Sequence, residues 1–209
     1  MKKFEFSLDK FQLSRMLSSF REKKDIINLW MSVIKLVLSY SKPSDCDVAG
    51  VLILHVDKMS RIFISSEEKS FSTSFPFSIY EKDSLLEFGA TSCPVVDNKV
   101  TSDIISLINA NNILCSRNVV EFADPLMDIS GDPDMIWELF RDLMLCDDGY
   151  IRIDHDPDNE NGKIHPLDHI DIFYSQSATF KIGLLERPDL TGFHDILNYR
   201  TDCHFLTAT

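Results

Sequence analysis

The chain has 209 residues, of which 44% are hydrophobic and 26% are charged, and its formal net charge is −12. A chain of this size and composition can bury the core of one large domain or two small ones. It contains no run of about 18 apolar residues, which excludes a helical membrane span. The basic N-terminus is not followed by the apolar stretch of a secretory signal, so we expect a cytoplasmic protein without a membrane partner.

The negative charge is concentrated in the C-terminal part of the chain. Residues 1–120 carry 15 basic and 14 acidic side chains, whereas residues 121–209 carry 6 basic and 19 acidic ones, a formal charge of −13. Because DNA phosphates repel such a surface, we expect no non-specific binding to duplex DNA. An anionic partner would instead meet residues 1–42, which have 9 basic and 4 acidic side chains.

The first part of the chain predicts helices. Apolar residues hint at a helix over residues 8–22, and a broad stripe with spacings of three and four predicts a stronger helix over residues 27–41. We therefore expect residues 1–42 to form a helical arm. Trp30 and Met31 would suit a partner interface, but a stripe of this kind more often faces the core of its own domain.

A continuous apolar run over residues 48–56 predicts a strand that is covered on both faces, and residues 61–65 are its expected hairpin partner. His55 lies inside that run and is expected to be a hydrogen-bonded core histidine rather than a catalytic one. Residues 67–88 have no clean periodicity and give no prediction.

Further along, the pattern is helical over residues 101–114, and residues 119–122 read as a short strand. Asp132 and Pro133 predict the start of the clearest helix, as its N-cap and first residue. A short helix is expected over residues 192–199. The whole pattern predicts a single α+β domain, in which N-terminal helices pack on a mainly antiparallel sheet. On this prediction, the arm precedes a sheet-containing body over residues 48–209.

Three runs between Tyr150 and Leu185 alternate apolar and polar residues, which predicts three strands with one polar face each. If the strands are neighbours in a meander, their polar side chains share one face of the sheet. We expect that face to be open to solvent. The five side chains that this pattern brings together are Arg152, Asp154, His169, Asp171 and Lys181.

These residue types allow acid–base chemistry on an anion. His169 would act as general base or acid, oriented by Asp154 or Asp171, and Arg152 with Lys181 would hold a phosphodiester or similar group. The alternative is that the same residues form ordinary cross-strand pairs on a polar sheet face.

A divalent metal is the only cofactor that the sequence suggests. Imidazole and carboxylate groups are good ligands for Zn, Mn or Fe, so His165, His169 and Asp154 are candidate ligands. The acidic loop over residues 154–165 resembles a calcium loop, but Asn159 stands at its sixth position and His165 at its twelfth. Calcium loops of the EF-hand type need glycine and glutamate there, so we expect a solvated hairpin loop.

The sequence motifs R-I-D at 152–154, H-P-L-D-H-I at 165–170 and F-K-I at 180–182 resemble an uncharacterised bacterial family. That family is classed only as a domain of unknown function, and its members are encountered on mobile elements and near defence genes. The resemblance is clearest over the last third of the chain and implies a prokaryotic cytosolic protein. The pattern R-x-D…H-P-x-x-H is also similar to that of small ribonuclease-type toxins.

Two functions follow as expectations. The first is a defence-associated or toxin-related protein, in antiviral defence or a toxin–antitoxin system, whose His/Asp/Arg site binds or hydrolyses a phosphate-containing ligand. The second is a non-catalytic acidic interaction module, such as an antitoxin, immunity or adaptor subunit, with a protein partner or a second copy of itself. A catalytic site needs His169 partly exposed with a carboxylate in reach, whereas an interaction module can bury it.

Overall fold

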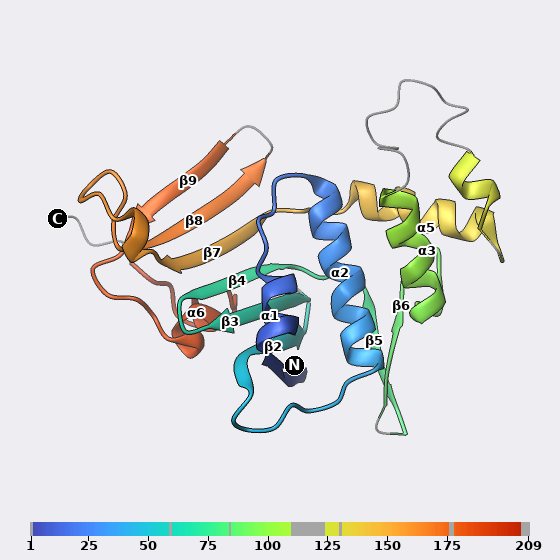
Figure 1. Ribbon diagram of the computed structural model, residues 1–209, viewed down its shortest axis with the longest axis horizontal. Coiled ribbons are helices and arrows are strands. Elements are labelled where there is room, and N and C mark those ends of the chain that lie inside the picture. The colour runs from blue at the N-terminus through green and yellow to red at the C-terminus, as the bar shows by residue number, and fades with distance from the viewer. Residues whose placement is uncertain are drawn as a thin grey trace.

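One antiparallel sheet of seven strands organises the part of the chain that the structure, a computed structural model, describes (Figure 1). The described residues are 2–58, 60–83, 85–109, 124–129, 131–175 and 178–205. The strand order is β1-β2-β3-β4-β7-β8-β9, and all neighbours pair in antiparallel fashion. These strands are β1 (Lys2–Asp9), β2 (Val48–Val56), β3 (Arg61–Ser66), β4 (Lys69–Ser74), β7 (Tyr150–His155), β8 (Asp168–Ser175) and β9 (Ala178–Gly183).

Between β4 and β7 the chain leaves the sheet. It forms a separate two-stranded hairpin, β5 (Ser78–Lys82) and β6 (Leu85–Gly89), and then the helices α3 (Asn98–Asn109) and α5 (Pro133–Leu145). This excursion includes most of the stretch that gave no prediction from periodicity. The part of the predicted helix beyond Asn109 and the predicted strand over residues 119–122 lie outside the described residues.

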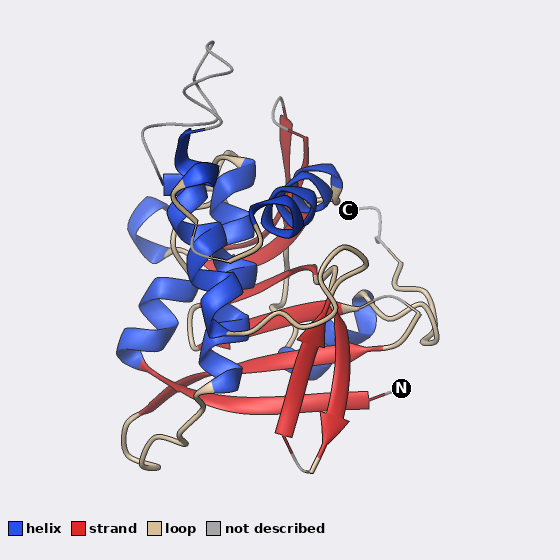
Figure 2. Ribbon diagram, turned by 90° about the vertical axis from the view of Figure 1, so that its right-hand side faces the viewer, coloured by secondary structure: helices blue, strands red, loops and turns tan. Residues whose placement is uncertain are grey.

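The main hydrophobic core lies between one face of the sheet and the helices α1 (Lys10–Met16), α2 (Lys23–Leu38), α3 and α5 (Figure 2). The stripe predicted on α2 is confirmed as core, because Trp30 and Met31 are fully buried. The indole N–H of Trp30 donates to the carbonyl oxygen of Ser74 at 2.8 Å, which ties α2 to the end of β4. These observations confirm the predicted α+β domain with helices packed on an antiparallel sheet.

The arm predicted over residues 1–42 starts with a strand instead of a helix. Residues 2–9 form β1, which pairs with β2 along its whole length. Phe4 and Phe6 pack against the main core and Leu8 is buried in it, so alternate residues face inward, as in any half-buried strand. Asp9 then ends the strand, and its side chain accepts a hydrogen bond from the backbone N–H of Gln12 as the N-cap of α1.

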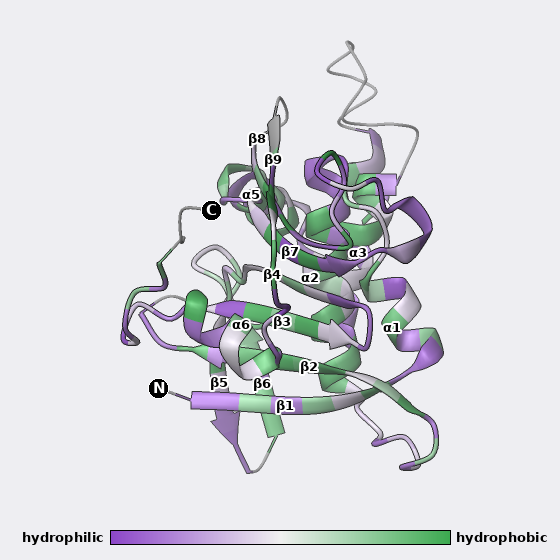
Figure 3. Cartoon of the chain, turned by 90° about the vertical axis from the view of Figure 1, so that its left-hand side faces the viewer, coloured by the Kyte–Doolittle hydropathy of each residue, from purple (hydrophilic) through white to green (hydrophobic). Residues whose placement is uncertain are grey.

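A smaller core lies on the opposite face of the sheet, beneath α6 (Leu190–Ile196). Phe193 of this helix packs with Ile53, Phe63 and Ile153. Both faces of β2 and β3 are therefore covered, which confirms the prediction from the continuous apolar run; Figure 3 shows the hydrophobic middle of these strands.

Asp132 caps α5 through a hydrogen bond from the backbone N–H of Met135, with Pro133 in the first turn, as the sequence predicts. None of the described helices combines the length and the apolar composition that crossing a bilayer requires.

His55 is confirmed as a hydrogen-bonded core histidine: its Nδ1 lies 2.7 Å from Nε2 of His194 on α6. One of the two rings must be neutral to accept this bond. Burial lowers the pKa of His55 and the neighbouring His194 lowers it further. The folded chain therefore binds this proton less readily than the unfolded chain, whose histidines titrate near pH 6.5.

We expect the contribution of His55 to stability to be complete above about pH 6.5 and to be lost as the pH falls toward its lowered folded pKa. His55→Gln removes the titrating group, so the decrease in unfolding free energy between about pH 7.5 and 5.5 should be smaller than in the unmodified protein. Urea denaturation at the two pH values measures this decrease in both proteins. The control is His204→Gln, which alters an exposed histidine and should leave the pH dependence unchanged.

Candidate functional site

The five polar side chains of β7, β8 and β9 lie on one face of the sheet, as predicted. The strand register places Arg152 opposite Asp171, Asp154 opposite His169, and Asp171 opposite Lys181. Residues that are directly opposed in an antiparallel pair project from the same face. The distance from His169 Nε2 to Asp154 Oδ2 is 3.8 Å, so the groups are close enough to act together.

The expectation that this face is open to solvent is wrong. His169 is 1% exposed, and Asp154 and Asp171 are each 4% exposed. The face is the same one that carries the main core, since Arg152 lies opposite the buried Phe71 of β4. The loop that joins β7 to β8 covers the buried residues, because the His165 ring packs edge-on against the ring of His169 at 4.6 Å.

Arg152 and Lys181 form the accessible rim of the site, with side chains that are 25% and 42% exposed. Arg152 Nη2 lies 2.7 Å from Oδ2 of Asp154 and 2.7 Å from Oδ2 of Asp171. One guanidinium group therefore holds two buried carboxylates side by side against their mutual repulsion. The other oxygen of each carboxylate, Oδ1, is buried and has no hydrogen-bond partner among the described residues.

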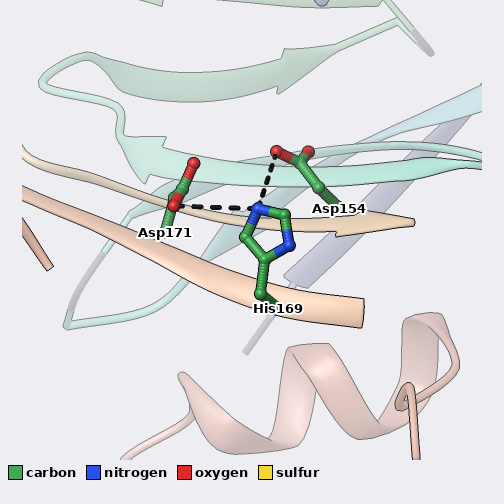
Figure 4. A group of neighbouring side chains, drawn as sticks. All are labelled: Asp154, His169 and Asp171. Atoms are coloured by element: carbon green, nitrogen blue, oxygen red, sulfur yellow. Dashed lines mark ion pairs between the residues drawn. The ribbon is translucent and has the colours of Figure 1, made fainter. Parts of the chain in front are cut away.

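The hydrogen bond of His169 to the backbone fixes which of its nitrogens carries the proton. Nδ1 lies 3.0 Å from the carbonyl oxygen of Pro166, which can only accept, so Nδ1 is the donor. Nε2 then faces Asp154 Oδ2 at 3.8 Å and Asp171 Oδ1 at 3.9 Å (Figure 4). In the neutral ring Nε2 presents a lone pair, so three electron-pair donors converge. These three donors repel one another, and a proton on Nε2 or a metal ion between them would remove that repulsion.

The three side chains form a group that could hold a metal ion. One ligand atom from each of Asp154, His169 and Asp171 lies within 4.8 Å of the others. With bonds of about 2.0–2.2 Å, a tetrahedral zinc ion needs its ligand atoms about 3.4 Å apart. The ligand atoms lie 3.8 and 3.9 Å apart where His169 meets the two carboxylates, so the side chains would have to move inward to reach that spacing. The Nδ1–H bond to a backbone carbonyl is a supporting contact that metal ligands usually have. Arg152 holds Asp171 through the oxygen that faces away from His169, but it holds Asp154 through the same Oδ2 that faces His169 Nε2.

The ligand set differs in one member from the set that the sequence suggested. Asp171 takes the place of His165, whose Nε2 lies 3.1 Å from Lys181 Nζ and 3.9 Å from Asp156 Oδ2. On a strand, residues two apart share a face, so His169 and Asp171 are neighbours there. That spacing already places both residues on the predicted polar face, whereas the H-x-x-x-H motif favoured His165 over Asp171 as the metal ligand.

The acidic loop behaves as a hairpin loop with its own polar contacts, consistent with the expectation. The side chain of Asp156 accepts hydrogen bonds from the backbone and the side chain of Asn159. These bonds, chiefly that from the Asn159 side chain, lower the pKa of Asp156.

A comparison with protein-family models finds no match to the chain, and comparisons with curated proteins and with solved structures find none either.

Proposed function

We propose that Asp154, His169 and Asp171 bind a divalent metal ion, and that the metal-loaded site binds a phosphate-containing ligand through Arg152 and Lys181. The convergence of His169 Nε2 with two carboxylates, each of which keeps one buried oxygen without a hydrogen-bond partner among the described residues, supports this function most directly. Buried polar atoms are nearly always paired in folded proteins. A metal ion would bring positive charge to all three groups at once, and beside Asp171 Oδ1 it would replace the Lys181 ammonium that lies 3.5 Å away.

The charges of the site favour an anionic ligand. Two carboxylates balance Arg152 and Lys181, which leaves the site formally neutral when His169 is neutral. A divalent ion would add two positive charges beside the exposed rim, and a phosphate group could neutralise them. Because His169 is buried and its Nδ1 is bonded to Pro166, we propose binding and assign no reaction.

Isothermal titration of the metal-free protein with Zn²⁺ and with Mn²⁺ tests the metal site. We expect binding of one of these ions, which Asp154→Asn and Asp171→Asn each abolish, because each replaces a charged ligand with a neutral amide. At a metal concentration of about 100 times Kd, the ion should raise the free energy of unfolding by about 2.7 kcal/mol. Inorganic phosphate should then bind the metal-loaded protein and not the metal-free one.

The matched control is Asp158→Asn, which removes one negative charge from an exposed position of the neighbouring loop. This variant should bind the ion as the unmodified protein does. If Asp158→Asn loses as much metal affinity as Asp154→Asn and Asp171→Asn do, the ion responds only to net charge, and the assignment of the site is wrong.

The second candidate is the non-catalytic acidic interaction module, with a protein partner or a second copy of the chain. The burial of His169 favours it, because a buried imidazole is not available to a substrate. If neither ion binds, the buried network has a structural role only, and this candidate is preferred. A role in bacterial defence or in a toxin–antitoxin system is proposed from the resemblance of the C-terminal motifs.

A further inference from the structure

We infer that Lys181 is a built-in counter-ion of the metal-free site, and that a metal ion displaces it and recruits His165 as a fourth ligand. Lys181 Nζ lies 3.1 Å from His165 Nε2 and 3.5 Å from Asp171 Oδ1. The ammonium group therefore stands between one proposed metal ligand and a second histidine. This role rests on the metal site proposed above. It adds that Lys181 controls whether that site holds a metal ion.

The contact with Lys181 determines which ring nitrogen of His165 carries the proton. An ammonium group has only donors, so Nε2 of His165 must accept with its lone pair, and the ring proton is on Nδ1. Nδ1 is buried and has no hydrogen-bond partner among the described residues. His165 thus offers an unprotonated nitrogen, the form in which imidazole binds metals, and Lys181 occupies it.

His165 lies beside His169 and is linked to Asp171, although its nitrogens are not among the ligand atoms that lie within 4.8 Å of one another, so the ring would have to move inward when Lys181 leaves. Its ring packs against the ring of His169 with 4.6 Å between centroids, and Lys181 links it to Asp171. Together with Asp154 it would complete a set of two imidazole and two carboxylate groups. Four nitrogen and oxygen ligands of this kind suit a tetrahedral zinc ion.

Lys181 has both the charge and the freedom to act as a competitor. Its positive charge beside Asp171 opposes the approach of a second cation to the same carboxylate. Its side chain is 42% exposed and has a flexible four-carbon stem, so the ammonium can move into solvent when a metal ion takes its place. In that position it is free to contact an anionic ligand at the rim of the site.

The experiment compares Zn²⁺ affinity in Lys181→Met and Lys163→Met by competition with a chromogenic chelator. Lys163 is an exposed lysine of the loop between β7 and β8, so the control removes the same charge nearby. We expect Lys181→Met to bind Zn²⁺ at least about tenfold more tightly than the unmodified protein, and Lys163→Met to change little. Adding His165→Gln to Lys181→Met should remove most of the gain in affinity.

The outcomes separate this inference from the proposed metal site. If the unmodified protein binds Zn²⁺ but Lys181→Met binds no more tightly than Lys163→Met, Lys181 is not a counter-ion and the metal site stands. If His165→Gln has no effect in the Lys181→Met background, the recruitment of His165 is refuted. If Lys181→Met binds Zn²⁺ and the unmodified protein does not, the role of Lys181 as counter-ion is supported, and the lysine keeps the unmodified chain free of metal. Failure of every variant to bind would reject both the site and its counter-ion.

Discussion

Arg152→Met is expected to lower the free energy of unfolding by about 3–5 kcal/mol, because it leaves two buried carboxylates without their shared partner. Arg152 Nη2 is 2.7 Å from both Asp154 and Asp171, whose side chains are 5% and 6% exposed. Methionine keeps most of the apolar stem, so the loss reports the guanidinium group and its charge rather than a cavity. Urea denaturation at neutral pH measures the change.

Two comparisons make this prediction specific. Arg141→Met breaks an exposed pair with Asp142 on α5 and should cost about 0.5 kcal/mol or less. Adding Asp154→Asn to Arg152→Met should restore part of the stability, because one unpaired buried charge is then gone. A loss below about 1 kcal/mol in Arg152→Met would mean that water or Lys181 compensates the carboxylates without the arginine.

Trp30→Ala should also cost about 3–5 kcal/mol, since it removes the largest fully buried side chain of α2. The indole lies in the main core, with its ring centroid 6.5 Å from that of Phe77. The substitution leaves a cavity beneath α2 and removes the donor that pairs with the carbonyl oxygen of Ser74. Thermal or urea denaturation followed by circular dichroism gives the loss.

The control is Trp30→Phe, which keeps an aromatic ring in the core but loses the indole N–H. It should lower the free energy of unfolding by less than Trp30→Ala does, because the phenyl ring fills part of the cavity that alanine leaves empty. If Trp30→Ala unfolds at nearly the same urea concentration as the unmodified protein, α2 is an appendage and not a part of the domain core.

The polar face illustrates what periodicity can and cannot predict. Alternation within each run was enough to place Arg152, Asp154 and His169 on one face, because side-chain direction in a strand is a local property. Burial was not predictable, because it depends on a covering loop and on charges that compensate one another across strands. Polar residues imply an exposed face only where such partners are missing.

The first strand was missed for a different reason. Phe4, Phe6 and Leu8 alternate with polar residues, so a period-two signal exists over residues 2–9. It is short, and the helical pattern over residues 8–22 overlaps its last two residues. The pairing partner that stabilises β1 is β2, whose residues are 39 to 54 positions away from their partners in the sequence. Local pattern could not reveal that pairing.

The pairing of β4 with β7 means that the sheet is completed late during synthesis of the chain. Strands β1 to β4 are complete once Ser74 has been synthesised, but β4 then has an open edge until Tyr150 and the following residues arrive. An unpaired edge can join another chain, so we expect the nascent chain to be prone to aggregation until β7 pairs with β4. Asp154 is in β7, which closes this edge, and His169 and Asp171 are in β8, which pairs with β7. A bound metal ion would therefore select the fully synthesised chain and hold its last strands in the sheet.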